Sequence, residues 1–227
     1  MSPLPLPIIA FFFLTVVVAL ALFSKAVRAS KPAILGAILW MGIQSKIALS
    51  GFYLVTNTLP PRLILAIVPP VLMIAALFLA PLGHRFFNTM DLKWLVLLHS
   101  IRILVEINLY WLFLYKQVPA LMTFEAGNVD ILFGLTAPLI WWAFSKGHVG
   151  RRGLLIWNSL ALLSVLNAFV RAMLSAPFRF QQLAFHQPTV AILSFPFILL
   201  PAFLVPSVIL CHLVIFRKLA GRNAQRP

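Results

Sequence analysis

The sequence predicts an all-α polytopic membrane protein, a bundle of seven transmembrane helices with the N-terminus outside and the C-terminus cytoplasmic. Hydrophobic residues make up 62% of the chain and charged residues only 10%, a composition that excludes an ordinary soluble domain. Apolar runs long enough to span a bilayer recur along the chain. The basic residues gather in alternate loops between these runs. We therefore expect a single transmembrane domain over residues 1–227, in the inner (plasma) membrane as a multi-pass protein.

Seven apolar runs define the predicted spans, which cover residues 8–23, 33–55, 63–82, 95–115, 131–144, 154–174 and 190–216. Lys25 follows the first run and no basic residue precedes it, so the run lacks the basic start of a secretory signal and we expect it to be retained. The third run contains Pro69 and Pro70, which predict a kink. The fifth is short and follows Asp130, which is placed to cap the next helix.

The distribution of basic residues predicts the orientation. With the N-terminus outside, twelve basic residues lie in the cytoplasm, namely Lys25, Arg28, Lys31, Arg85, Lys93, Lys146, Arg151, Arg152, Arg217, Lys218, Arg222 and Arg226. Only Arg62, Lys116 and Arg179 then lie outside. This bias is typical of cytoplasmic loops. It also explains the net charge of +14 without a nucleic-acid partner.

A faint internal repeat suggests how the spans are grouped. Residues 38–40 (Ile-Leu-Trp) in the second span resemble residues 155–157 (Leu-Ile-Trp) in the sixth, and the span after each is rich in proline. This pattern is compatible with two parallel three-helix units joined by the fourth helix, an arrangement known among transporters. In outline it is similar to the small seven-helix sugar transporters, although none of their motifs is present.

The fourth span carries the most informative polar residues. At about 100° per residue, His99, Arg102 and Glu106 share one helical face, which Tyr110 continues. A charge at the bilayer centre costs from about 2.5 to more than 10 kcal/mol. Arg102 and Glu106 are four residues apart and close enough to neutralise each other in part. We therefore expect this face to meet other helices or a water-filled cavity.

The second and sixth spans carry further polar stripes. Lys46, Tyr53 and Asn57 share a face of the second span, and Asn167 and Arg171 share one of the sixth. The candidate ligand-binding residues are therefore Lys46, Tyr53, Asn57, His99, Arg102, Glu106, Tyr110, Asn167 and Arg171.

The expected balance of charge suggests a ligand. Glu106 is the only acidic residue expected within a span, against the cations Lys46, Arg102 and Arg171. This imbalance predicts an outward-facing polar cavity with surplus positive charge, which suits a carboxylate, a phosphate or a lipid headgroup. The alternative is an internal ion-pair network that fixes helix packing.

Two histidines, His99 and His212, are expected at similar depth near the cytoplasmic side. Hydrogen-bonded packing or proton transfer is the usual role of such residues. The alternative is axial ligation of a haem, which needs two facing histidines. We expect no other cofactor and no metal site, because only four acidic residues are present.

Enzyme signatures such as H-E-x-x-H and G-x-S-x-G are absent from the sequence. We expect a protein that binds and transports a small anionic or amphipathic molecule, with the lipid bilayer as its other partner. Two alternatives remain open: an intramembrane enzyme acting on a lipid or isoprenoid, and a structural subunit of a membrane complex.

Overall fold

The computed structural model describes residues 4–221, and within this range the chain is all-helical, without a strand. Five helical stretches are long and apolar enough to cross a membrane, or six if one bent pair counts as a span. The five are α1 (Leu6–Ala26), α2 (Lys31–Leu49), Leu92–Leu114, α8 (Arg151–Ser175) and Leu200–Gly221. The all-helical class expected from the sequence is confirmed, and the apolar helices fit a membrane protein, while the seven-helix count stays a prediction. Of the expected cytoplasmic tail, Arg222 and Arg226 lie outside the described residues.

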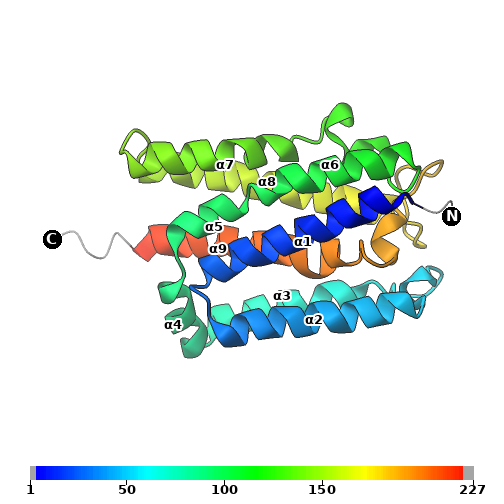
Figure 1. Ribbon diagram of the computed structural model, residues 1–227, viewed down its shortest axis with the longest axis horizontal. Helices are drawn as coiled ribbons and strands as arrows, with labels where there is room; N and C mark the ends of the chain where they lie inside the picture. Colours follow the sequence, from blue (N-terminus) through cyan, green and yellow to red (C-terminus); the bar gives the residue numbers. More distant parts are fainter. Residues whose placement is uncertain (1–3, 222–227) are drawn as a thin grey trace.

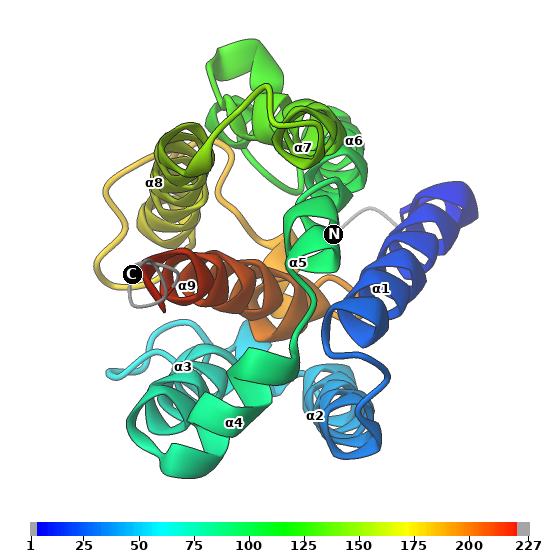
Figure 2. The ribbon, with the colours of Figure 1, turned by 90° about the vertical axis from the view of Figure 1, so that its left-hand side faces the viewer.

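Most of the helices lie roughly side by side along the long axis of the molecule (Figure 1). Viewed from one end, α9 (Val205–Gly221) lies near the centre, with α8 and α7 (Asp130–Ser145) on one side and α2 and α3 (Ile64–Leu79) on the other (Figure 2). α1 packs on α5 (Leu92–Leu98) and α6 (Ile101–Leu114), which together form the Leu92–Leu114 span.

The proposed three-helix units are recognisable only in the C-terminal part of the chain. α7 packs on α8, and α8 packs on α9. By contrast, the extensive contacts of α1 are with α5 and α6, while α2 and α3 contact the π-helical turn Leu200–Leu204 (η5) that precedes α9. The N-terminal helices α1, α2 and α3 therefore pack mainly on the rest of the bundle and not on one another.

The third predicted span is a bent pair. α3 continues through Pro69 and Pro70, and a bend of 94° separates it from α4 (Pro81–Thr89). The bend lies at Ala80, whose extended backbone is suited to the following proline. Gly83 allows the close approach of the two helices, because a Cβ there would lie 1.8 Å from the carbonyl oxygen of Leu77. α4 consequently lies across the end of the bundle (Figure 2).

Two predicted spans, 33–55 and 190–216, are shorter as helices than expected. α2 ends at Leu49 because Gly51 adopts a left-handed conformation with φ of 75°, and the chain continues as the turn Phe52–Leu54 (η1). The C-terminal helical stretch begins only at Leu200. Residues 190–199 before it form the turn Ala191–Leu193 (η4) and irregular backbone, where Pro196 cannot donate a helical hydrogen bond.

The carbonyl of Ala202 in η5 is satisfied by another helix. A π-turn disturbs the regular bonding pattern of a helix, and the indole Nε1 of Trp40 on α2 donates to this carbonyl over 3.0 Å. Backbone groups inside a membrane need such partners because no water is available there. This bond connects α2 to the centre of the bundle.

α7 is too short for a complete span. Its 16 residues cover about 24 Å, less than the roughly 30 Å of a bilayer core. Residues 116–129 before it contain only the turns Ala120–Met122 (η2) and Phe124–Ala126 (η3). The helix begins at Asp130, which pairs with Arg102 about 15 Å along the Leu92–Leu114 span. α7 thus starts near the middle of the bundle.

Candidate functional site

The charged face of α6 meets the first turn of α7. Arg102 donates from Nε to Oδ2 of Asp130 over 2.8 Å and from Nη2 to Oδ1. The two side chains are 2% and 8% exposed, so this is a buried bidentate ion pair. Gly134 permits it, because a Cβ there would lie 2.9 Å from the backbone nitrogen of Ile103 on α6. The missing side chain lets α7 lie directly against α6.

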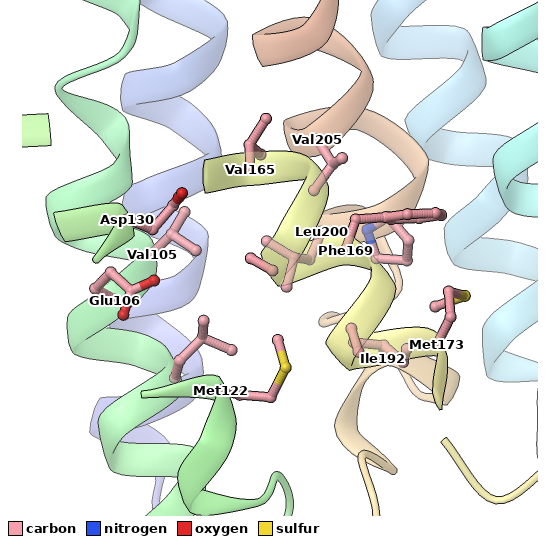
Figure 3. A pocket seen from close by; sticks show the side chains of 14 residues that line it. Val105, Glu106, Met122, Asp130, Val165, Phe169, Met173, Ile192, Leu200 and Val205 are labelled. Carbon is pink, nitrogen blue, oxygen red and sulfur yellow. The ribbon is translucent and has the colours of Figure 1, made fainter. Parts of the chain in front are cut away.

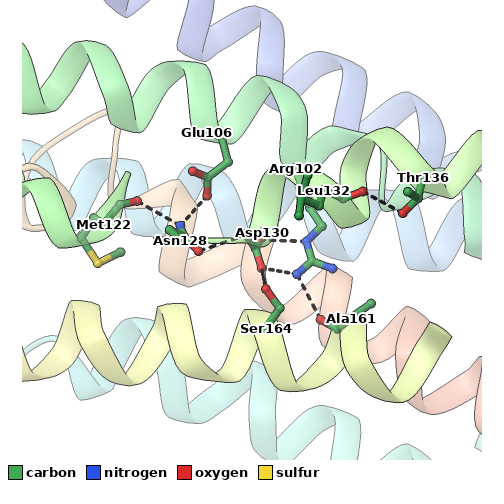
Figure 4. Close-up of polar contacts among 9 residues, drawn as sticks. All are labelled: Arg102, Glu106, Met122, Asn128, Asp130, Leu132, Thr136, Ala161 and Ser164. Atoms are coloured by element: carbon green, nitrogen blue, oxygen red, sulfur yellow. Dashed lines mark hydrogen bonds and ion pairs between the residues drawn. The ribbon is translucent and has the colours of Figure 1, made fainter. Parts of the chain in front are cut away.

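α8 completes the surroundings of the ion pair. Ser164 donates to Oδ1 of Asp130 over 2.7 Å, and the carbonyl of Ala161 accepts from Nη2 of Arg102 over 3.0 Å. The guanidinium carbon also lies 5.3 Å from the ring centre of Phe133. Figure 4 shows this network between the three helices. Both carboxylate oxygens of Asp130 are therefore occupied by donors.

Glu106, one turn further along α6, has a different environment. Asn128 donates from Nδ2 to Oε1 of Glu106 over 2.7 Å and to the carbonyl of Met122 over 3.0 Å. The second oxygen, Oε2, is buried and has no hydrogen-bond partner among the described residues. The Glu106 side chain is therefore held by a neutral amide and not by a cation, and it retains one unused acceptor.

A cavity of about 70 Å³ lies beside the two carboxyl groups. Figure 3 shows Glu106 and Asp130 on one side of it, facing apolar side chains. Its other lining residues come from α6, η2, α8, η4 and the start of the C-terminal helix: Val105, Leu109, Met122, Val165, Ala168, Phe169, Ala172, Met173, Ile192, Leu200, Pro201 and Val205. The cavity is thus mainly apolar, with carboxyl groups on one side.

His99, at the end of α5, and His212, on α9, stack on each other. Their ring centres are 3.9 Å apart with an angle of 22° between the planes. Nδ1 of His212 lies 2.8 Å from Oδ1 of Asn158, and Trp157 packs edge-on against His99. Both rings are fully buried. The two imidazole rings face each other so closely that a porphyrin has no space between them, so the arrangement does not suit axial haem ligation. No cluster of three metal-ligating side chains occurs within residues 4–221.

The structure separates the other candidate residues from this site. Lys46, Asn57 and Asn167 are exposed. Tyr53 is buried, but its hydroxyl donates to Oε1 of Gln44, and it lies beyond the end of α2. The continuous polar stripe expected on the second span is therefore absent, because the helix ends before Tyr53 and Asn57.

Tyr110 and Arg171 lie nearer the loop between α6 and α7. Tyr110 packs against Phe124 with ring centres 5.1 Å apart. Arg171 is half-buried, and its Nη1 donates to the carbonyl of Leu121 over 3.3 Å. Neither residue lines the cavity. Arg171 instead fixes the turn η2 to α8.

The expected excess of positive charge is absent from the cavity. The sequence interpretation treated Glu106 as the only intramembrane acid and Asp130 as an exported cap. Asp130 is in fact buried and pairs with Arg102, because α7 begins inside the bundle. Lys46 is exposed. The site therefore contains two carboxyl groups and one guanidinium.

Sequence reasoning placed Ser164 on the polar face of the sixth span, but it missed the contact of Ser164 with Asp130, the pairing of Asp130 with Arg102 and the contact of Asn128 with Glu106. One signal was available, since Asn128 and Asp130 come directly before a predicted span of only 14 residues. A span that short indicates a helix that begins below the membrane surface.

The part of the chain that carries the network matches a protein family. A family model described as "Domain of unknown function (DUF8737)" matches residues 59–220, which is most of the chain. The chain belongs to this family. The DUF8737 region runs from just before α3 to the end of α9, so it contains the whole Arg102–Asp130–Glu106 network and the cavity, while α1 and α2 precede it. No curated protein and no solved structure matches the chain.

Proposed function

We propose that this DUF8737 protein is a multi-pass plasma-membrane protein that binds a small amphipathic molecule in the cavity beside Glu106 and Asp130 and carries it across the membrane. The observation that carries the proposal is Oε2 of Glu106, a buried acceptor without a partner at the edge of an apolar cavity. Buried polar atoms are rarely left unpaired, and in a membrane protein an intramembrane ionisable group is a candidate functional residue.

The form of the backbone around the cavity also supports binding. α7 begins beside the cavity, and the turns η2, η4 and η5 all contribute lining residues. Interrupted helices near the middle of the membrane are the usual place for substrate sites in transporters. Irregular backbone at this depth is tolerated where it is buried in protein or lines a cavity.

The charges of the site favour an amphipathic ligand over a simple anion. An anion would meet two carboxyl groups, and the guanidinium of Arg102 is already bound to Asp130. An amphipathic molecule would place its polar end at Glu106 and its apolar part against side chains such as Val165 and Phe169. The 70 Å³ cavity sets a small size for the part that enters.

We further propose seven membrane crossings with the N-terminus outside. The five long apolar helices supply five, the bent pair α3 and α4 a sixth, and α7 with the loop before it the seventh. The cytoplasmic side would then be the end at which α4 lies. At this end Nζ of Lys25 and Nζ of Lys93 lie 4.6 and 5.2 Å from the ring centre of Trp94, as cation–π contacts.

A purely structural role is the second candidate, and the saturation of both Asp130 oxygens by Arg102 and Ser164 favours it. Arg102, Asp130 and Ser164 join α6, α7 and α8 without any ligand. Such a network fixes helix packing by itself. The unpartnered oxygen of Glu106 and the cavity are the features that this alternative leaves unexplained.

The test fills the cavity. Ala168→Leu and Ala168→Phe place extra atoms among the lining residues, and Ala76→Phe on the exposed surface of α3 is the matched control. Untargeted mass spectrometry of the purified wild type should find a small amphipathic molecule that is depleted from both Ala168 variants and retained by Ala76→Phe. Proteoliposomes should then take up that molecule unchanged. Identical co-purifying molecules in all four proteins would refute binding in the cavity, and a chemically altered molecule would indicate an enzyme.

A further inference from the structure

The charged groups at the cavity can be counted from the elements that surround Glu106. α6 contributes Arg102 and Glu106, and the first turn of α7 contributes Asp130. The lining residues from η2, α8, η4, η5 and α9 are all uncharged. Arg171 on α8 lies outside the lining and donates to the carbonyl of Leu121. The site therefore holds one cation and two carboxyl groups.

The single cation is committed to one of these carboxyl groups. Arg102 donates to both oxygens of Asp130, its other bond from Nη2 goes to the carbonyl of Ala161, and its Nη1 is buried without a partner among the described residues. The N-terminus of α7 carries only a partial positive charge, and the carboxylate of Asp130 in the first turn of α7 already offsets this charge. Glu106 is bound by the neutral amide of Asn128. An ionised Glu106 would thus have no cationic side chain as its partner.

An uncompensated charge at this depth is costly, so the neutral states of the site are favoured. Two such states exist. In one, the Glu106 carboxyl group holds a proton. In the other, Glu106 is ionised and a cation lies at Oε2. Glu106 is 1% exposed, so a cation that reaches Oε2 must do so through the cavity, whose remaining walls are apolar.

We propose that the cavity binds the ammonium group of a small alkylamine in exchange for the proton of Glu106. This inference rests on the proposed function and names its substrate class. In the exchange, the O–H bond of the Glu106 carboxylic acid breaks and its proton leaves to water, while the alkylammonium ion enters and donates a hydrogen bond to Oε2. One positive charge enters and one leaves, so the net charge of the site stays the same and no oxidant or further reactant is needed.

The exchange explains why the two carboxyl groups have different surroundings. Asp130 is saturated by Arg102 and Ser164 and keeps a fixed structural role. Glu106 has one oxygen held by Asn128 and one oxygen without a partner. The apolar walls formed by residues such as Val105, Phe169 and Leu200 would contact the alkyl part of the amine.

The experiment compares three probes of equal chain length, n-hexylamine, 1-hexanol and hexanoate, with the full-length protein in nanodiscs at pH 7. At this pH an alkylamine is protonated, as a lysine side chain is. Titration calorimetry gives the affinity, and a pH-sensitive dye in weak buffer reports protons. We expect n-hexylamine to bind at least about tenfold more tightly than the other two, a difference of roughly 1.4 kcal/mol, and to release about one proton per molecule bound.

Glu106→Gln tests the residue while keeping the acceptor that Asn128 uses. The variant should retain the wild-type melting temperature, release no proton and lose the preference for n-hexylamine. If the glutamine variant folds poorly, Glu106→Ala should also release no proton and lose the preference for n-hexylamine. Glu125→Gln removes an exposed carboxylate from the loop between α6 and α7 and should match the wild type.

The outcomes separate this inference from the proposed function. Binding of 1-hexanol or hexanoate in preference to the amine would overturn the inference and leave the cavity as a binding site. Amine binding without proton release, or proton release that persists in Glu106→Gln, would overturn the exchange. Binding of none of the three probes would overturn the inference, and the cavity-filling variants would then decide the proposed function independently.

Discussion

Arg102 and Asp130 lie 28 residues apart in the chain, and they form a buried bidentate ion pair between α6 and α7. The pair is the one salt bridge found in residues 4–221. Breaking a buried pair leaves one charge without a partner, which is far more costly than losing an exposed pair. The two residues consequently hold the first turn of the short helix α7 against α6.

Asp130→Asn should be strongly destabilising. It leaves the Arg102 guanidinium buried beside a neutral amide, and such losses typically cost about 3–5 kcal/mol. Arg102→Gln should have a similar effect, and the double variant should be less destabilised than the sum of the two. Thermal unfolding in detergent measures the three. Additive effects of the single variants would contradict a direct interaction.

Gly134→Ala should destabilise the contact between α6 and α7. The added Cβ would lie 2.9 Å from the backbone nitrogen of Ile103, so the helices must separate, at a typical cost of about 1–3 kcal/mol. Gly36→Ala on α2 is the matched control, since nothing lies within 4 Å of a Cβ there. That control should be neutral or slightly stabilising because alanine favours helix. Equal melting temperatures of the two variants would argue against the close approach.

Trp40→Phe should loosen α2 from the bundle. The substitution removes the indole donor and leaves the carbonyl of Ala202 without this partner, at an expected cost of about 1–3 kcal/mol for a buried acceptor. Faster hydrogen exchange in α2 would report the effect. Trp142→Phe, at a side chain that is 55% exposed, should leave exchange in α2 unchanged. Equal exchange in both variants would speak against the anchoring role of Trp40.

The proposed orientation can be tested with reporter fusions. Alkaline phosphatase is active only outside the cytoplasm, so a fusion after Gln181, in the loop that follows α8, should be active. A fusion after Phe216, in the last turns of α9, should be inactive. The opposite pattern would reverse the orientation and place the loop residues 116–129 on the cytoplasmic side.

Hydropathy and helical periodicity were sufficient to predict most of the helices. Apolar length predicts α1, α8 and the Leu92–Leu114 span within a few residues of their observed ends. Periodicity also predicts that His99, Arg102 and Glu106 share one buried face, and all three are buried. These features depend on neighbours along the chain, which the sequence displays directly.

The partners of that buried face could not be predicted in the same way. Asp130 looks like an ordinary helix cap because its sequence neighbours are loop residues, and only the folded chain brings it to Arg102. The end of α2 depends on the left-handed conformation of Gly51, and the late start of the C-terminal helix on irregular backbone before Leu200. Depth and pairing are properties of tertiary packing, so spacing alone assigned Glu106 to Arg102.

The start of α7 at Asp130 has a consequence for how the chain is assembled in the membrane. During translation, α6 reaches the insertion machinery first and presents Arg102, whose transfer to lipid costs about 2.5–3.5 kcal/mol on insertion scales. α7, with 16 residues and a carboxylate at its first position, is too short to be a strong insertion signal. Entry of the two helices as one hairpin pairs the two charges before either contacts lipid. We therefore expect α6 and α7 to insert as one unit, after the nascent chain has been made as far as the end of α7.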